Sequence, residues 1–375
     1  MRSVHYIIPT VNIGGAEKRF IEIWCYLQSL QQEFDLRLII SKQLHEVLLE
    51  QPVLYAKLRP YENRISIFEI DTSLPVIRFQ KALYEFVKKH SKKEDILHFI
   101  LYFPTYVFPL QHDNTLYSLT ESSLDNVNIK GRLLYLLNIF RSRYSDILDP
   151  VVHKQVQGYF FFKRKSIKHT PGSFTDTDFF KPAGNYQKSN SFVFLGRFFY
   201  VKQVVDLLKA VPAICEKLHE AGFHDFRFIF LGYGQQQQEM LEILQQPVYK
   251  NLPVEVRFSN APEKILAGSK VFFSVQLRNN YPSKSLLEAM SAGNIPLVTD
   301  VGTTRLIADP AFSYYVPEQF SANDISKQLI SILSLSREAQ EEKMKAAREF
   351  VINRFSINTS AAYYLDLYRN LAKNP

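Results

Sequence analysis

The sequence is poor in cysteine and has no long apolar run. Cys25 and Cys215 are its only cysteines, and they lie far apart. Two such residues form neither a disulfide framework nor a structural zinc motif, so the reducing cytoplasm is the expected compartment. The first apolar run, 4–8, is too short for a signal-peptide core. Because no stretch of about 18 uncharged apolar residues occurs, no segment is expected to span a bilayer.

The composition nevertheless supports packed domains. Apolar residues make up 46% of the chain and charged residues 22%, a balance that argues against disorder. A length of 375 residues predicts two domains. The net charge of +8 favours anionic partners such as phosphates or acidic lipids. No recognised nucleic-acid-binding module accompanies that charge, so no nucleic-acid partner is expected.

Short apolar runs that suit strands alternate with segments of helical periodicity. A helix is predicted over 203–219, where apolar residues recur at helical spacing. The alternation occurs twice and predicts an α/β protein with two Rossmann-like, parallel-sheet domains. A segment rich in Gly, Pro, Ser and Thr, 171–191, separates them. The predicted strands are 4–8, 36–40, 65–70, 96–101, 115–120, 192–196, 226–231, 254–258, 271–275 and 296–299.

Glycine follows the first predicted strand at a turn into a helix. Gly14 and Gly15 stand there, and free backbone N–H groups at a helix start favour an anion. No G-x-G-x-x-G fingerprint is present, and no carboxylate follows the second strand, which disfavours a dinucleotide site. A tight turn without a ligand remains the alternative.

Cations follow the first strand of the second half. That strand ends in Gly196 and Arg197, and Lys202 comes at the start of the next helix. The carboxyl ends of parallel strands form the usual ligand edge of such a sheet. Arg grips a phosphate with two hydrogen bonds and Lys adds a point charge, so the pair indicates a phosphate site. Two solvated surface cations are the alternative. The next strand also ends in glycine, at Gly232.

The most informative segment is 271–305. A buried strand leads into a polar loop, and Pro282 and Ser283 then open a helix that contains Glu288 and ends at Gly293. The run N-Y-P-S-K-S-L-L-E-A-M-S-A-G-N-I-P-L-V resembles the donor-binding region of retaining GT-B glycosyltransferases of family 4, the glycosyl transferases group 1. In that family the typical run is E-G-F-G-x-x-x-L-E-A-M-A-x-G-x-P-V-V. The resemblance also covers Gly14-Gly15-Ala16-Glu17, Gly196-Arg197 with Lys202, Gly232-x-Gly234 and the crossover Gly172-x-x-x-Asp176-x-x-x-Phe180-x-Pro182.

The resemblance implies a GT-B fold of two Rossmann-like domains that face each other across a cleft. An acceptor-side domain would span 1–175 and a nucleotide-sugar donor-binding domain 176–355. A C-terminal helix over 356–375 would pack back on the first domain. Partners would be a nucleotide-sugar donor, such as a UDP- or GDP-sugar, and a saccharide or lipid-linked acceptor.

The resemblance also implies roles for particular residues. Arg197 and Lys202 would bind the donor diphosphate and stabilise it as a leaving group, which requires no metal ion and no cofactor. Glu288 would accept hydrogen bonds from the nucleotide ribose. The other implied donor-binding residues are Gly14, Gly15, Gly196, Gly232, Ser283, Ser285 and Leu286.

Two positions depart from the family pattern. Asn280 stands where the family often has a glutamate that touches the donor sugar, and we count it with Arg197 and Lys202 as catalytic. Asn is shorter and neutral but still donates and accepts hydrogen bonds, so a different sugar, a slower enzyme and a lost activity all stay open. The family's histidine at a central strand end is missing. His98 and Glu121 are the candidate cleft residues instead, with a core histidine as the alternative for His98.

Two further features have simpler explanations beside the functional ones. Asp176-Thr177-Asp178 matches the D-x-D metal motif of another glycosyltransferase class, but its Gly/Pro-rich setting predicts a turn. Residues 126–145 mix basic, apolar and aromatic side chains. This mixture suits either a helix at an anionic membrane surface or a core-facing helix with a basic rim. Peripheral association with the inner face of the membrane is therefore left open.

Together these features predict a metal-independent, retaining glycosyltransferase. It would move a sugar from a nucleotide-diphosphate sugar to a saccharide or lipid-linked acceptor, in the synthesis of bacterial cell-surface polysaccharide or glycolipid. The alternatives are a catalytically weak sugar-nucleotide-binding protein of the same fold and a sugar-nucleotide epimerase of the GT-B type.

Overall fold

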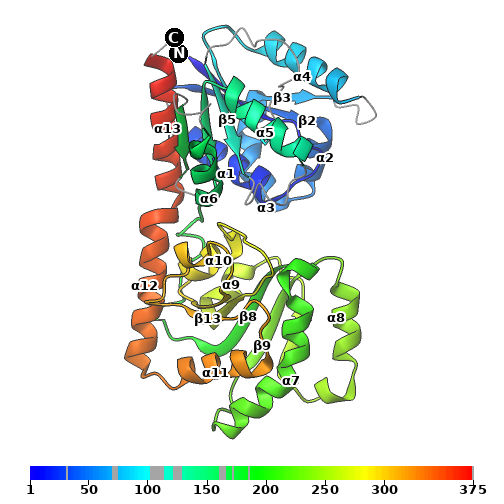
Figure 1. The fold of residues 1–375 in the computed structure, drawn as a ribbon, viewed down its shortest axis with the longest axis vertical. Helices are drawn as coiled ribbons and strands as arrows, with labels where there is room; N and C mark the ends of the chain where they lie inside the picture. The colour runs from blue at the N-terminus through cyan, green and yellow to red at the C-terminus, as the bar shows by residue number, and fades with distance from the viewer. Residues whose placement is uncertain are drawn as a thin grey trace. The chain divides into compact units, whose positions relative to one another are not determined.

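The computed structural model describes residues 1–30, 33–69, 75–101, 114–120, 129–159, 166–170, 173–184 and 186–373. They form two compact units, each built on one parallel β-sheet (Figure 1). The first unit comprises Met1–Ser173 and Ile357–Pro375, and the second comprises Phe174–Ser356. The predicted α/β architecture with two Rossmann-like parallel sheets is confirmed. Within the described part of the chain, no helix is long and apolar enough to cross a membrane.

The sheet of the first unit has seven parallel strands in the order β3-β2-β1-β4-β5-β6-β7. The strand order reverses at β1, as in doubly wound folds. All five strands predicted for this half are present, whereas β6 and β7 have no counterpart in the prediction, because both are short and β6 carries the polar Ser145 and Asp146. The strands are β1 Ser3–Ile8, β2 Asp35–Ser41, β3 Ile65–Phe68, β4 Ile96–Ile100, β5 Thr115–Leu119, β6 Tyr144–Ile147 and β7 Ser166–His169.

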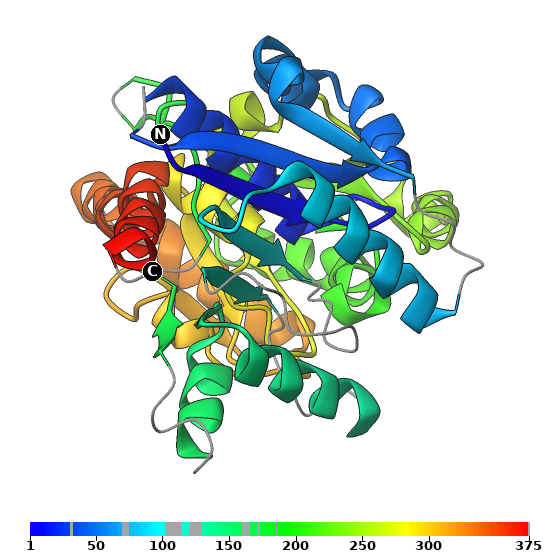
Figure 2. The same ribbon diagram turned by 90° about the horizontal axis from the view of Figure 1, so that it is seen from above.

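Helices cover both faces of this sheet (Figures 1 and 2). Helices α4, α5 and α6 pack on one face through an apolar cluster that includes Leu83, Ile139 and Val156. Helices α1 and α13 pack on the other face, where Phe20 meets His98 of β4. The helices are α1 Gly15–Ser29, α2 Lys42–Leu49, α3 Pro52–Leu58, the 3₁₀ helix η1 Arg59–Arg64, α4 Val76–His90, α5 Ile129–Arg141, α6 Pro150–Gly158 and α13 Ile357–Lys373.

Helix α5 is shorter than the predicted helical segment 126–145. It ends at Arg141, and Tyr144 already belongs to β6. The Arg143 backbone N–H donates to Thr115 Oγ1 over 2.9 Å, which holds the chain at the sheet edge beside β5. A tertiary contact therefore ends the helix before its apolar pattern does.

A buried polar network joins α13 to the sheet. The Tyr368 hydroxyl donates to the Tyr6 hydroxyl over 2.6 Å and lies 2.9 Å from His98 Nδ1. On the opposite side of its ring, His98 Nε2 lies 2.7 Å from the Ser118 hydroxyl. All of these side chains are buried. Burial lowers the pKa of His98 to about 3, and the nearby Arg19 charge adds to the effect, so the imidazole is neutral.

Asp146 of β6 extends this network. Its carboxylate accepts hydrogen bonds from Ser118 and, over 3.0 Å, from the Tyr364 hydroxyl of α13. Burial raises the pKa of Asp146 to about 6, against the opposing effects of its hydrogen bonds and of Arg19. Polar strand residues are thus satisfied by a helix that is distant in sequence.

Replacing Tyr368 by Phe should destabilise the first unit by about 1–3 kcal/mol, because the buried partners Tyr6 and His98 lose a hydrogen bond that no water replaces. Trp24, the single tryptophan, is buried in this unit, so its fluorescence reports on unfolding there. Urea titration followed by that fluorescence measures the change.

Tyr26→Phe is the matched control. Its hydroxyl bonds Asn358, also between α1 and α13, but at the surface. We expect the unfolding free energy of this variant to change by less than about 0.5 kcal/mol. Equal effects of the two substitutions would refute a special contribution of the buried network.

The sheet of the second unit has six parallel strands in the order β10-β9-β8-β11-β12-β13. The five strands predicted for this half are present, and the three-residue β13 is additional. The strands are β8 Ser189–Arg197, β9 Arg227–Tyr233, β10 Val254–Arg257, β11 Ser269–Ser274, β12 Ile295–Thr299 and β13 Tyr314–Val316.

Two apolar clusters cover the faces of this sheet. One holds α7, α8 and α11 through residues such as Leu207, Met240 and Leu329. The other holds α9, α10 and α12 through residues such as Leu287 and Val351. The helices are α7 Val204–Glu220, α8 Gln237–Leu244, α9 Pro262–Gly268, α10 Lys284–Ser291, α11 Ala322–Leu333 and α12 Arg337–Phe355, with 3₁₀ helices at Tyr200–Lys202 (η3), Pro247–Tyr249 (η4) and Thr304–Leu306 (η5).

Candidate functional site

The carboxyl ends of the central strands of the second sheet gather the predicted phosphate-binding residues. β8 pairs in parallel with β9 on one side and β11 on the other. Arg197 is the last residue of β8, and η3 with Lys202 follows directly. The loop after β11 starts at the same edge, because parallel strands bring their carboxyl ends together. Polar residues from separate segments thus meet there.

Lys202 is fixed by the loop that follows β11. Its Nζ donates to Gln276 Oε1 over 3.0 Å, and the Leu277 backbone N–H donates to the carbonyl of Val201 over 3.0 Å. Thr299 of β12 bonds the backbone of Gln276, its Oγ1 lying 3.0 Å from the N–H and 2.9 Å from the carbonyl oxygen. Desolvation lowers the pKa of Lys202 to about 8, and the charge of Arg197 contributes.

Arg197 lies exposed at the end of β8. Its guanidinium stacks over the Phe199 ring at 5.0 Å from the centroid. No ion pair found among the described residues involves Arg197. Arg197 ends β8 and Lys202 ends η3, only five residues later, so both cations belong to the carboxyl edge of the sheet. Together they make this edge of the sheet electropositive.

A small pocket lies next to Gln276, the hydrogen-bond partner of Lys202. It holds about one water molecule, with a volume of ≈ 10 Å³. Three predicted site residues line it, Asn280, Ser283 and Leu286, and so does Gln276, which holds Lys202. The structure therefore brings Lys202 and the start of α10 to one place. The full lining is Gln276, Asn279, Asn280, Tyr281, Ser283, Leu286, Thr304 and Ile307.

The N-terminus of α10 faces this pocket. Ser283 occupies the N-cap position, but its side chain makes no capping hydrogen bond. Its Oγ lies 3.5 Å from Oγ of Ser285. The first N–H groups of a helix carry a partial positive charge and bind anions. Two hydroxyls and this helix end therefore suit a phosphate or a ligand hydroxyl. Glu288 lies further along α10 and is buried.

Glycine at 232 and 234 has a structural reason in the unit itself, whereas a Cβ at 196 would make only ordinary contacts with the Phe194 ring. Gly232 has φ +155°, and a Cβ there would lie 1.8 Å from the carbonyl oxygen of Gly196. Gly234 is similarly close to the Phe198 backbone. Phe198 N–H donates to the Tyr233 carbonyl over 2.8 Å, so the chain beyond β8 presses against the end of β9. These glycines let the Arg197 segment pack on β9.

Some pocket residues were not singled out from the sequence. Asn279 Oδ1 accepts from the Thr303 N–H over 3.1 Å and from its hydroxyl over 2.9 Å. Gly302, with φ +55°, allows this approach, since a Cβ would lie 2.6 Å from the Asn279 side chain. Gln276 was missed too. Its signal in the sequence is its place just after a buried strand, at the ligand edge of the sheet.

Gly14 and Gly15 belong to the first unit. Gly14 is the N-cap of α1, and its N–H donates to Glu17 Oε2 over 2.9 Å, which gives this amide a partner inside the unit. A Cβ on Gly15 would meet nothing within 4 Å. Gly15 therefore leaves space beside the start of α1, while the backbone N–H of Gly14 is already hydrogen-bonded to the Glu17 carboxylate.

Of the two candidate cleft residues, His98 and Glu121, the structure describes only His98. His98 is buried, and both ring nitrogens are hydrogen-bonded, contacts that suit a core histidine. Glu121 lies outside the described residues, as do Gly172 and the segment 121–128.

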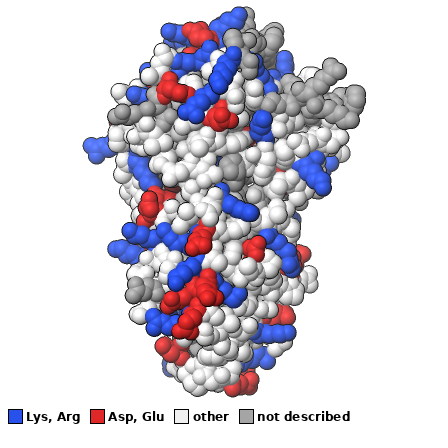
Figure 3. Space-filling model, turned by 90° about the vertical axis from the view of Figure 1, so that its left-hand side faces the viewer, with Lys and Arg blue, Asp and Glu red and all other residues white. Residues whose placement is uncertain are grey.

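The D-x-D sequence forms a turn, as the sequence predicts. Asp176 Oδ1 accepts from the N–H groups of Asp178 and Phe179, at 3.2 and 3.0 Å. Within the described ranges, no group of three or more His, Cys, Asp or Glu side chains is placed to hold a metal ion. Basic and acidic side chains are interspersed on the face drawn in Figure 3, so the net charge of +8 forms no single basic patch on that face.

Comparison with known proteins defines the class to which this site belongs. Residues 175–350 match the model of a family described as "Glycosyl transferases group 1". The matched segment is nearly the whole second unit. No curated protein matches the chain.

Several solved structures are similar to the whole chain. A glycosyltransferase from Rickettsia africae has a TM-score of 0.74 at 15% identity, over 100% of this chain and 99% of that one. HepE from Anabaena, in complex with UDP and glucose, has a TM-score of 0.72 at 12% identity, over 99% and 100%. A TarM mutant from S. aureus, bound to fondaparinux, alpha-GlcNAc-glycerol and UDP, has 0.73 at 13%, over 100% of both.

These similarities establish the fold. The two parallel-sheet units have the GT-B fold, as the sequence predicts. The segment that matches the group 1 model contains Arg197, Lys202, Asn280, Ser283, Ser285, Leu286 and Glu288.

Proposed function

We propose that this protein transfers a sugar from a nucleotide-diphosphate sugar to a saccharide or lipid-linked acceptor, with retention of configuration and without a metal ion. The observation that carries the proposal is the grouping of Arg197, Lys202 and the α10 N-terminus at one edge of the second sheet, within the segment that matches the group 1 model. Departure of a nucleoside diphosphate develops negative charge, which preorganised cations and helix N–H groups stabilise.

Each residue has a defined part in this proposal. Arg197 binds the diphosphate oxygens, and Lys202, held by Gln276, neutralises the charge that develops on departure. Ser283 and Ser285 donate to phosphate or sugar oxygens at the start of α10. Glu288 accepts hydrogen bonds from the ribose hydroxyls. The two cations do the work that a divalent ion does in metal-dependent transferases, so EDTA should leave transfer unchanged.

The Arg197 assignment is tested with UDP, the nucleotide bound in two of the structures compared above. Arg197→Ala should weaken UDP binding by at least about tenfold, because a charge-assisted hydrogen bond to phosphate is lost. Isothermal titration of the full chain measures the dissociation constant. GDP and ADP are titrated in parallel to identify the base.

Arg257→Ala is the matched control. Arg257 ends β10 at the same edge, two strands away, and already pairs with Glu255 at 2.9 Å. Its replacement should change UDP affinity less than about twofold. Equal losses in both variants would contradict a specific role for Arg197.

The low pKa of Lys202 predicts a pH dependence. Lys202 loses its proton around pH 8 in the free protein, and only the ammonium attracts a diphosphate. UDP affinity should therefore fall about tenfold between about pH 7 and about pH 9. Lys202→Arg keeps its charge over this range and should flatten the profile. A wild-type affinity that stays constant across the range would exclude a charged Lys202 from the site.

The exposed face of α5 supports a lipid-linked acceptor or membrane-proximal work. Apolar side chains at helical spacing are exposed along it, and basic residues flank them. Such a face binds anionic membranes by combining apolar insertion with charge attraction. The exposed apolar residues are Ile129, Leu133, Leu137 and Phe140, and the exposed flanking cations are Lys130 and Arg141.

Sedimentation with vesicles that contain an anionic phospholipid tests this face. Ile129→Asn/Leu133→Asn should remove most vesicle binding, because about 2 kcal/mol of apolar insertion is lost per side chain. Val53→Asn/Ile77→Asn is the control, since both residues are comparably exposed at 62% and 64% on other helices of the unit. If the α5 variant sediments with the vesicles as the wild type does, the exposed face of α5 is not a membrane-binding surface.

Asn280 favours one second candidate function, a sugar-nucleotide-binding protein with little turnover. It lines the pocket where the family often places a glutamate. A screen for hydrolysis or transfer from several sugar nucleotides separates the two functions. Binding without turnover supports the second, and Asn280→Glu should then raise turnover if the carboxylate is the missing group.

A further inference from the structure

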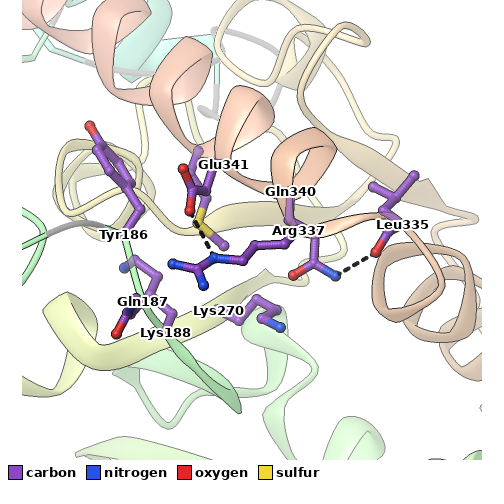
Figure 4. Close-up of a pocket in the computed structure, with 9 residues that line it drawn as sticks. Tyr186, Gln187, Lys188, Lys270, Leu335, Arg337, Gln340 and Glu341 are labelled. Atoms are coloured by element: carbon purple, nitrogen blue, oxygen red, sulfur yellow. Dashed lines mark hydrogen bonds and ion pairs between the residues drawn. The ribbon is translucent and has the colours of Figure 1, made fainter.

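A second, larger pocket lies at the opposite edge of the second sheet (Figure 4). Residues 186–188 lead into β8, and Lys270 stands at the start of β11, so the pocket is at the amino ends of these parallel strands. The start of α12 closes another side. The volume is ≈ 540 Å³, within the roughly 300–1,000 Å³ typical of small-molecule sites. The lining is Tyr186, Gln187, Lys188, Lys270, Leu335, Arg337, Gln340, Glu341 and Met344.

The lining is cationic. Lys188, Lys270 and Arg337 face one carboxylate, Glu341, so three positive charges against one negative leave +2. Arg337 Nε pairs with Glu341 Oε1 at 3.2 Å, and Figure 4 shows this pair on the pocket wall beside the lysines. The charge of Glu341 is thereby matched by Arg337. The two lysines supply the excess.

Both lysines have only neutral partners in the described part of the chain. Lys188 Nζ donates to the carbonyls of Leu266 and Ala292 over 2.9 and 2.8 Å, and Lys270 Nζ donates to Asn190 Oδ1 over 2.6 Å. Desolvation lowers the pKa of Lys188 to about 7 and also lowers that of Lys270. Ammonium groups held partly out of water without a counter-ion gain from a bound anion.

This pocket is separate from the candidate donor site. Lys188 contacts Ala292, the C-cap of α10, whereas the donor site lies at Ser283, the N-cap. The eight residues of α10 put about 12 Å between its ends. A ligand in one pocket therefore leaves the other open.

We propose that this pocket is a second ligand site, which binds the phosphate monoester of a small metabolite or of a lipid headgroup. A bound phosphate monoester carries nearly two negative charges at neutral pH and favours the protonated form of Lys188, so the lining then reaches the matching excess of +2. The pocket exceeds the size of a bare phosphate, and Tyr186, Gln187 and Gln340 offer polar and aromatic surface to the rest of the ligand. The site does not depend on the proposed transfer reaction.

Titration of glycerol 3-phosphate into the full chain, with saturating UDP present, tests the proposal. We expect saturable binding that UDP does not displace. Lys270→Gln/Arg337→Gln should weaken it at least about tenfold, because two of the three cations are removed. Lys250→Gln, at an exposed lysine outside both pockets, should change the affinity less than about twofold.

The control arms separate the possible failures. The double variant should bind UDP like the wild type. If the wild-type protein binds no UDP at all, that result counts against the donor site and not against this pocket. Vesicles with phosphatidic acid identify the source. Sedimentation that the double variant loses indicates a lipid headgroup, and binding of glycerol 3-phosphate alone indicates a metabolite. The proposal is overturned if UDP displaces glycerol 3-phosphate or if the double variant still binds it with wild-type affinity. It is also overturned if the wild type shows no binding of glycerol 3-phosphate at about 10 mM.

Discussion

Parallel pairing of β8 with β9 and β11 is the constraint on which the candidate donor site depends. It brings the ends of separate segments to one edge, so that Lys202 reaches Gln276 although the two are 74 positions apart in the chain. The pairing is close enough that Gly232 faces the Gly196 carbonyl with no room for a Cβ. Arg197 is the residue after Gly196. Its position at the sheet edge is therefore set by the close packing of β8 on β9.

The first unit solves a different problem, the satisfaction of polar groups on buried strands. His98, Ser118 and Asp146 point from three neighbouring strands into an apolar interior, where each unpaired group would cost about 1–3 kcal/mol. Tyr364 and Tyr368 of α13 supply their partners. The last helix of the chain is thus part of the core of this unit, and a histidine on a central strand serves packing and hydrogen bonding.

Charge is distributed differently at the two edges of the second sheet. At the carboxyl edge, Arg197 and Lys202 share the end of the sheet with the N-terminus of α10, an arrangement that favours an anion. At the amino edge, Lys188 and Lys270 are held by carbonyl and amide oxygens inside a pocket. One sheet therefore presents two anion-attracting surfaces, and α10 separates them. The family motif accounts for the first edge alone.

The sequence by itself determined the α/β class and ten of the thirteen strands in the described part of the chain, because hydrophobic periodicity is a local signal. It also supplied Arg197, Lys202 and 280–288 as candidate site residues. It could not yield β6, whose polar Ser145 and Asp146 read as a loop, or Gln276 and Asn279, which matter only through partners distant in the chain. Tertiary structure alone decided that His98 is enclosed by α13 and that Lys188 and Lys270 share a pocket. Burial and long-range hydrogen bonds fix these features, and neither leaves a periodic trace in the chain.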